Sequence, residues 1–163
     1  MEAAYHAEGW RELYVMLGGS IAALTGLLFV ATSLNVAKIG KVPHFRIRAF
    51  SNTFALVGQF INSALVLVPQ PALWLGVELA AFSLFMMFFI LVRLYLAWTR
   101  AKAKLPTARM LAGTLGWSLQ ILSGLSLIAH FGGGLFFNVA GCLIVIWVVV
   151  WNAFSMTIAR YAD

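Results

Sequence analysis

Five long apolar runs constrain this chain more than any other feature of its sequence. Four runs carry no charged residue: Leu13–Ala37, Ala49–Val68, Met110–Phe131 and Leu135–Ala159. The fifth, Ala72–Thr99, is interrupted only by Glu78 and Arg93. A helix needs about 20 mostly apolar residues to cross a bilayer. Because lipid offers no partner to unpaired backbone groups, each run is expected to be helical.

We therefore predict an all-α integral membrane protein, a bundle of five transmembrane helices. Residues 1–163 form a single domain, with spans at about 13–37, 49–68, 72–99, 110–131 and 135–159. The runs lack the alternation of a membrane barrel, and short connections make successive helices antiparallel. Only 10% of the residues are charged, against about 25% in soluble domains. This composition excludes a soluble enzyme and a disordered chain.

The basic residues predict the orientation of the bundle. The connections 38–48 and 100–109 are rich in Lys and Arg, whereas 69–71 and 132–134 contain neither. Cytoplasmic loops carry the excess of Lys and Arg. The amino terminus is therefore expected outside and the carboxy terminus in the cytoplasm. The first run follows no basic signal-peptide region, so we expect it to be retained.

Several kinds of chemistry are excluded or weakened by the sequence. The net charge of +6 sits between apolar runs and not on one face, so no nucleic-acid partner is expected. The single cysteine, Cys142, excludes an internal disulfide and a cysteine-rich metal site. Phosphate-loop and nucleophile motifs are absent from the sequence. We predict no enzymatic activity, no cofactor and no metal, with a haem or redox subunit as a lower-ranked alternative.

Polar residues inside the apolar runs are informative because such residues rarely face lipid. Their depth, counted from the predicted loops, places them in two layers. The outer layer, interpreted as a permeation cluster, comprises Glu78, Gln59, Asn62, His130 and Asn138. The inner layer comprises Asn52, Arg93 and Asn152.

Glu78 is the sharpest of these positions, since an ionised carboxylate within a membrane is costly unless it is paired or hydrated. With His130 as its candidate partner, it would be a protonatable or cation-binding group in an outer vestibule. Alternatively, it is a carboxyl near the headgroups that is hydrogen-bonded to Asn62 or to backbone. For His130 the structural alternative is an interfacial histidine. For Arg93 it is a topology anchor that reaches the inner interface.

Small residues predict close contacts between helices. Gly18, Ala22 and Gly26 recur at four-residue spacing in the first run, and the fourth run carries Gly113, Gly116 and Gly124. Small residues at such spacing let two helix backbones approach closely. The contact lies either within one subunit or between subunits. We expect a homo-oligomer.

Two stretches in the first half resemble a known group of proteins. One is the sequence GGSIAALTGLLFVA at residues 18–31; the other runs from Arg48 through the apolar run to Gln70 and then Glu78. Both are similar to small bacterial multi-span membrane proteins of unknown function, some labelled "modulator of FtsH protease". The resemblance implies a multi-pass protein of the bacterial cytoplasmic (inner) membrane and no established activity.

A shorter stretch, Arg46–Asn52, resembles the Arg-x-x-x-Phe-Ser-Asp signature of a family of potassium-leak channels. Here Asn52 replaces the Asp, and the motif opens the second run instead of the first. The resemblance implies permeation.

The sequence therefore leaves two alternative functions, which belong to different classes. The first is a homo-oligomeric channel or permeation protein for protons or small cations, since rings of carboxylates and amides select cations. The alternative is a non-catalytic accessory or regulatory protein that binds another membrane complex. In that case the polar residues only hold helices together. Membrane lipids are expected partners in both cases.

Overall fold

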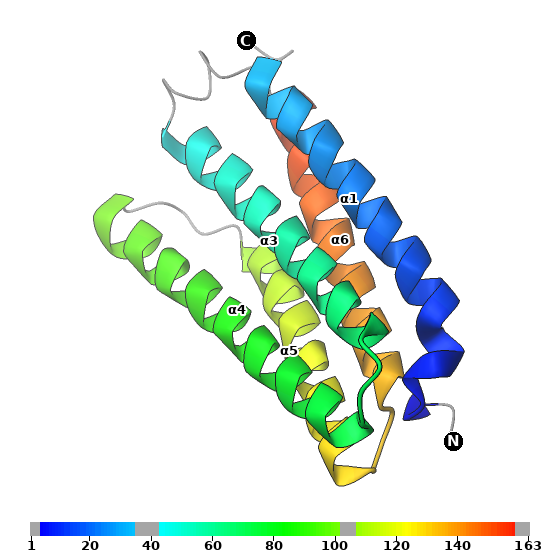
Figure 1. Ribbon diagram of the computed structural model, residues 1–163. Coiled ribbons are helices and arrows are strands. Elements are labelled where there is room, and N and C mark those ends of the chain that lie inside the picture. Colours follow the sequence, from blue (N-terminus) through cyan, green and yellow to red (C-terminus); the bar gives the residue numbers. More distant parts are fainter. Residues whose placement is uncertain (1–3, 35–42, 102–106, 159–163) are drawn as a thin grey trace.

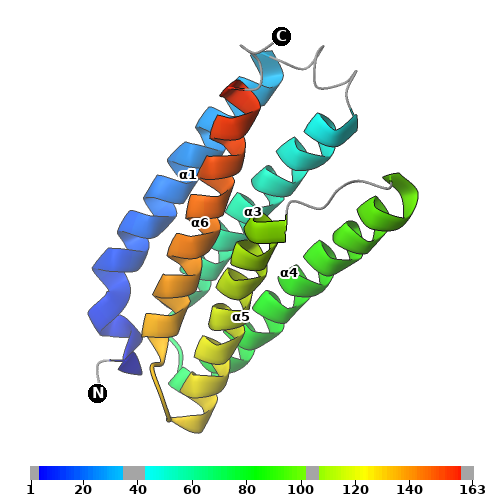
Figure 2. The same cartoon turned by 180° about the vertical axis from the view of Figure 1, so that it is seen from behind.

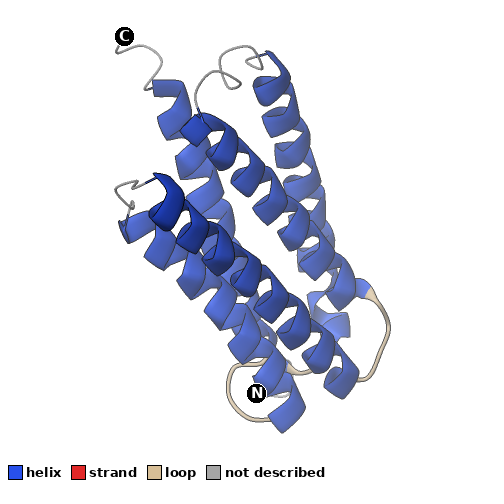
Figure 3. Ribbon diagram, turned by 90° about the vertical axis from the view of Figure 1, so that its left-hand side faces the viewer, coloured by secondary structure: helices blue, strands red, loops and turns tan. Residues whose placement is uncertain are grey.

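The computed structural model describes residues 4–34, 43–101 and 107–158 as an all-helical bundle (Figure 1). The long helices are α1 (Arg11–Leu34), α3 (Pro43–Leu67), α4 (Ala72–Ala101), α5 (Thr107–Ala129) and α6 (Leu135–Ile158). A short 3-10 helix, η2 (Ala7–Trp10), leads into α1. Every described element is a helix (Figure 3), which confirms the predicted all-α class.

The helices match the predicted spans closely. Five stretches are long and apolar enough to cross a membrane: Ala7–Leu34, Ala49–Leu67, Ala72–Val92, Ala108–Ala129 and Leu135–Phe154. When the helix bounds themselves are compared with the predicted spans, the largest difference is at α3. This helix begins at Pro43, six residues before the predicted start at Ala49. Proline at a first helical position loses no hydrogen bond, so the helix extends through basic residues that hydropathy alone assigns to a loop.

Successive helices run antiparallel, so both described turns lie at one end of the bundle (Figures 1 and 2). We call this the turn end; it comprises residues 4–10, 68–71 and 130–134. The carboxy-terminal part of α6 lies at the opposite end. The most extensive helix contacts join α4 with α5, α5 with α6 and α1 with α3, and α3 also contacts α6 and α4. α3 thus links α1 to the α4–α5–α6 layer.

Glycines bring α5 into direct backbone contact with both of its neighbours. A Cβ atom on Gly124 would lie 2.6 Å from the Gly76 carbonyl oxygen and from the Ala80 nitrogen, both on α4. On the α6 side, a Cβ atom on Gly116 would lie 3.0 Å from the Gly141 carbonyl oxygen. Gly116 and Gly124 therefore serve contacts within one subunit. The third small residue predicted on this helix, Gly113, makes no such contact, since a Cβ built on it meets no neighbouring helix within 4 Å.

The small residues of α1 divide between two environments. Gly18 is buried, and a Cβ there would lie 3.8 Å from Cβ of Ser63 on α3. Ala22 and Gly26 are exposed, and no atom lies within 4 Å of a Cβ built on Gly26. The reason is the orientation of α1, which packs on α3 through the face that carries Tyr14, Leu17 and Ile21.

The α5–α6 turn is held by Ser126. Its hydroxyl donates to the Phe131 carbonyl at 2.6 Å and accepts from the Gly134 amide at 2.8 Å. His130, Gly132 and Gly134 adopt positive φ angles of 50°, 96° and 47°. Glycine tolerates this left-handed conformation without steric cost, which explains the glycines at positions 132 and 134.

The amino-terminal segment is fastened to the α5–α6 turn. The Tyr5 hydroxyl donates to the Gly132 carbonyl at 2.9 Å, and the Tyr5 ring stacks on His130 with centroids 5.5 Å apart. Trp10 packs edge-on against Phe136 of α6 at 4.6 Å. These contacts seat η2 across the turn end.

Candidate functional site

Four carboxamide side chains meet in the interior between α3, α5 and α6. Gln59, Asn62, Gln120 and Asn138 are all fully buried, each 0% exposed. Gln120 is the centre of the group: its Nε2 donates to Gln59 Oε1 at 2.9 Å, and its Oε1 accepts from Asn62 Nδ2 at 3.3 Å. Two helices are thereby joined through paired amides.

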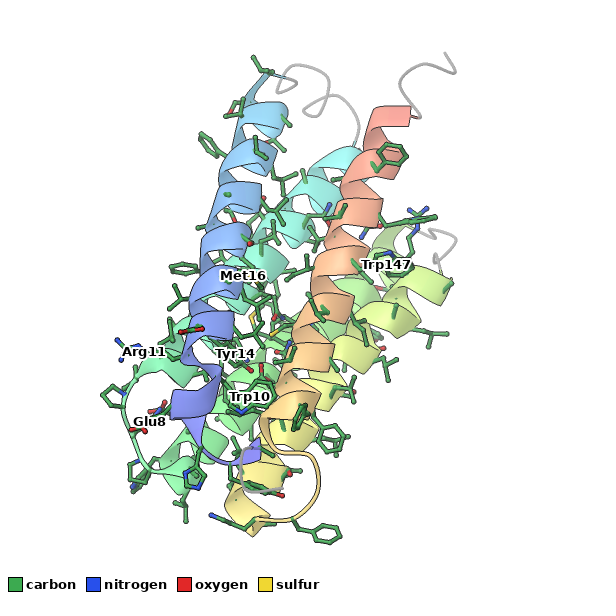
Figure 4. All side chains as sticks on the ribbon, turned by 90° about the vertical axis from the view of Figure 1, so that its right-hand side faces the viewer. Glu8, Trp10, Arg11, Tyr14, Met16 and Trp147 are labelled. Carbon is green, nitrogen blue, oxygen red and sulfur yellow. The ribbon has the colours of Figure 1, made fainter. Side chains whose placement is uncertain are left out.

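Cys142 of α6 completes this group. Its thiol donates to Asn138 Oδ1 at 3.3 Å and contacts Asn62 Oδ1 at 3.8 Å, and it accepts from Gln120 Nε2 at 3.7 Å. We call Gln59, Asn62, Gln120, Asn138 and Cys142 the amide network. Tyr14, fully buried, lies on the side of α1 that faces α6 (Figure 4).

Several buried polar atoms have no hydrogen-bond partner within the described part of the chain. Two belong to the amide network, Gln59 Nε2 and Asn138 Nδ2; the others are the Tyr14 hydroxyl, Asn52 Nδ2, Ser83 Oγ and Ser123 Oγ. A buried polar group without a partner costs about 1–3 kcal/mol. The interior therefore retains hydrogen-bonding capacity that its own side chains do not use.

The structure brings together part of the outer layer predicted from the sequence. Gln59, Asn62 and Asn138 are in the amide network, whereas Glu78 and His130 are exposed. The Glu78 carboxylate accepts a hydrogen bond from Gln70 Nε2 at 2.8 Å. The two partners predicted for Glu78 contact other side chains instead. The His130 ring stacks on Tyr5, and Asn62 donates a hydrogen bond to Gln120.

Depth alone could not separate Glu78 from the network, because it does not specify the direction in which a side chain leaves its helix. The buried face of α4 runs through Leu75, Leu79, Ser83 and Met86, and Glu78 lies outside it. Gln120 and Cys142 were missing from the predicted cluster. One sequence pattern does indicate that Gln120 is buried. It lies four residues after Gly116 and three before Ser123, so all three share one face of the helix.

The inner layer is also partly assembled. Asn152 Nδ2 donates to Asn52 Oδ1 at 3.4 Å, which joins α6 to α3. Arg109, which the sequence analysis assigns to a basic connection, is a third member of this group. Its guanidinium donates to Asn152 Oδ1 at 3.4 Å. Arg93 lies in α4, but its side chain lies outside the described residues.

A cavity of about 540 Å³ opens at the turn end. Its polar wall includes an acidic and a basic side chain, Glu8 and Arg11. The other polar lining residues come from the segment before η2 and from the two turns: Tyr5, His6, Gln70 and His130. Figure 4 shows Glu8 and Arg11 side by side at this end. Val66, buried one helical turn from Asn62, lines the cavity on the side of α3. Among the described residues, no three His, Cys, Asp or Glu side chains are grouped to hold a metal ion.

The burial of Cys142 predicts a thiol that does not react in the folded protein. Cys142 is the only cysteine in the sequence. Its side chain is 0% exposed and lies among the amides of the network. A small maleimide is expected to label it at least tenfold more slowly than a cysteine placed at Phe131, which is 82% exposed. Mass spectrometry of the detergent-solubilised protein measures both rates. Equal rates in folded samples would contradict the buried position.

Comparison with protein-family models, with curated proteins and with solved structures gave no significant match to this chain. The resemblances in the first half of the chain therefore stay predictions.

Proposed function

We propose that the five long helices span a bacterial cytoplasmic (inner) membrane with the amino terminus outside. The support is the length and composition of the helices, together with the charge of their connections. The described helix ends Leu34, Pro43, Ala101 and Thr107 lie opposite the turn end. The sequence between them holds Lys38, Lys41, Lys102 and Lys104. Because basic loops stay in the cytoplasm, the turn end would face outward.

Labelling of introduced cysteines tests this orientation. In intact cells, a membrane-impermeant maleimide is expected to label Phe131→Cys and to spare Lys104→Cys until the membrane is opened. The natural Cys142 is buried and adds little background. The reverse pattern would invert the proposed topology.

We further propose that the protein is a homo-oligomeric permeation protein for protons or small cations, with one route inside each subunit. The amide network carries this proposal. Polar groups at such depth in a membrane are costly and mark substrate or ion pathways. Amide oxygens are also the kind of neutral ligand that replaces the hydration shell of a cation. The network oxygens already accept hydrogen bonds, so a cation would have to displace those donors. The unpartnered Gln59 Nε2 and Asn138 Nδ2 can donate to water and not to the cation.

The polar groups of the subunit follow one another along the bundle. The cavity at the turn end comes first, the amide network second, and the Asn52–Asn152–Arg109 cluster third. On α3, the buried side chains of Val66 and Leu56 lie one turn to either side of Asn62 and Gln59. We interpret this arrangement as a closed state in which two apolar constrictions block the route, as hydrophobic gates do.

The proposed route leaves Glu78 outside the conducting interior. Its carboxylate is bonded to Gln70, which lines the cavity. Glu78 would then influence the entry of a cation at the mouth and would not bind it in the interior. Neutralising Glu78 is therefore expected to change flux less than altering Gln120.

Flux through liposomes that contain the purified protein tests the permeation proposal. Wild-type protein is expected to exceed empty liposomes in a proton, potassium or sodium gradient. Gln120→Met, which keeps the side-chain length and removes the amide, should reduce that flux about tenfold, and Glu78→Gln about twofold. Leu122→Met is the matched control, since Leu122 is exposed on the same helix. No flux above empty liposomes from well-folded protein would refute permeation.

A second function is favoured by the outward face of α1. Gly19, Ala22, Ala23 and Gly26 are exposed there, and such a face admits the close approach of another helix. An accessory protein would use it to bind a transmembrane helix of a different protein. A stoichiometric partner that co-purifies from native membranes, and that Ala22→Leu abolishes, would support this function. A purely homomeric particle would oppose it.

A further inference from the structure

Arg109 is held at the end of the bundle opposite the turn end by two residues of α6. Its guanidinium donates to Asn152 Oδ1 at 3.4 Å, and its Cζ lies 5.9 Å from the centre of the Trp151 ring. The side chain is half-buried. A guanidinium fixed in this way has lost much of its rotational freedom before any ligand arrives, which favours binding of an anion.

The positive charge of Arg109 is not neutralised by any carboxylate in the described part of the chain. The carboxylates described there are Glu8 of η2, Glu12 in the first turn of α1 and Glu78 within two turns of the start of α4, all toward the turn end. Arg109 is separated from that end by the length of α5, about 30 Å from the rise per residue of an α-helix. A charge pair over this distance is screened.

The polar atoms behind Arg109 also favour an anion. The Asn152 and Asn52 side-chain oxygens already accept hydrogen bonds, from Arg109 and from Asn152. Asn52 Nδ2 is buried without a partner among the described residues, and Asn52 is only 3% exposed. The unused hydrogen-bonding capacity of this cluster is therefore for donation: Asn52 Nδ2 is buried, and the half-buried Arg109 guanidinium keeps donors beyond the one that bonds Asn152.

An apolar strip of α6 lies directly beside the guanidinium. Trp147, Trp151 and Phe154 are 58%, 50% and 65% exposed, and the two indole rings lie 5.5 Å apart. Trp147 projects outward from α6 (Figure 4). A ligand that matches both features has an anionic head and a long apolar tail. Arginine binds phosphate through paired hydrogen bonds, and basic sites between helices bind anionic lipid headgroups.

We propose that Arg109, Asn152 and Trp151 form a binding site for the phosphodiester of an anionic glycerophospholipid, with an acyl chain lying along Trp151 and Trp147. The proposal rests on the proposed insertion into a membrane and is independent of permeation. It assigns to Arg109 a specific lipid contact beyond the general attraction of basic loops to anionic membranes.

Native mass spectrometry of the purified protein tests this site by counting bound lipid during a titration. Dioleoyl phosphatidylglycerol is expected to bind at a concentration at least tenfold lower than dioleoyl phosphatidylcholine. Arg109→Gln retains a donor for Asn152 and removes the charge, so it should weaken phosphatidylglycerol binding about tenfold. Trp151→Leu should weaken it about threefold. Arg11→Gln, which removes an exposed arginine at the turn end, is the matched control and should bind as wild type does.

Three outcomes would overturn the lipid site. The first is unchanged phosphatidylglycerol binding by Arg109→Gln that has the wild-type circular dichroism spectrum. The second is equal binding of the two lipids by wild-type protein. The third is displacement of phosphatidylglycerol by inorganic phosphate at equal concentration, which would assign the site to a free ion. None of these measurements uses a gradient, so a negative flux assay leaves the lipid result unaffected.

Discussion

Gly124→Ala is expected to lower the free energy of unfolding in detergent by about 3 kcal/mol, the upper end of the range for overpacking. The added methyl group would lie 2.6 Å from two backbone atoms of α4, the Gly76 oxygen and the Ala80 nitrogen. A flexible side chain can move away from such a contact, but a helix backbone cannot. The two helices would have to separate along the most extensive contact in the bundle. Thermal unfolding followed by circular dichroism measures the loss.

Gly113→Ala is the matched control, because it makes the same change on the same helix. No atom lies within 4 Å of a Cβ built on Gly113, so the methyl group enters open space. Alanine is favoured over glycine in a helix interior by up to about 1 kcal/mol. The control should therefore be as stable as wild type or slightly more stable. Equal destabilisation by both substitutions would mean that α4 and α5 do not approach as closely as described.

Gln120→Leu is expected to cost about 1–3 kcal/mol of stability, because it leaves buried groups without partners. Asn62 Nδ2 and Gln59 Oε1 both lose their bond to Gln120. Asn62→Leu alone should cost less, since Gln120 then keeps its bond to Gln59. The double variant Asn62→Leu/Gln120→Leu should cost less than the sum of the two single variants. The difference is expected to be about 0.6–1.7 kcal/mol, the range seen for hydrogen bonds between membrane helices.

Ser123→Ala provides the control for this network. Ser123 is buried on the same helix, and its hydroxyl has no partner among the described residues. Its removal should be neutral or slightly stabilising, since it relieves an unsatisfied polar group. Strict additivity of the Asn62 and Gln120 variants in the same unfolding assay would show that their amides are not coupled.

The sequence predicts the helices well and their contacts only in part. The positions and lengths of the helices follow from the apolar runs, because an uncharged run of about 20 residues is typical of a membrane-spanning helix. Faces within one helix also follow: Gln59 and Asn62 lie three residues apart and share the interior side of α3. Partners on other helices depend on how each helix is rotated about its axis. That rotation places Gln120 and Cys142 against α3 and leaves Glu78 exposed on α4.

Arg109 shows a second limit of the sequence. Hydropathy begins the fourth span at Met110, which assigns Arg109 to a basic loop. The structure begins α5 at Thr107, so the arginine falls in the first turn of the helix and meets α6. A helix boundary displaced by a few residues thus moves a charged side chain from a predicted loop to a contact with a neighbouring helix.

The bond between Tyr5 and Gly132 also has a consequence for the order of assembly during synthesis. Its two residues are 127 positions apart, so Tyr5 leaves the ribosome long before the turn to which it bonds. Until the α5–α6 turn exists, the amino-terminal segment has no surface on which to seat, and the cavity at the turn end lacks a wall. A nascent chain that ends before Gly132 would carry α1, α3, α4 and α5 without the complete cavity. The turn end therefore combines a segment that is made early with a turn that is made late, and it is completed only when the two meet.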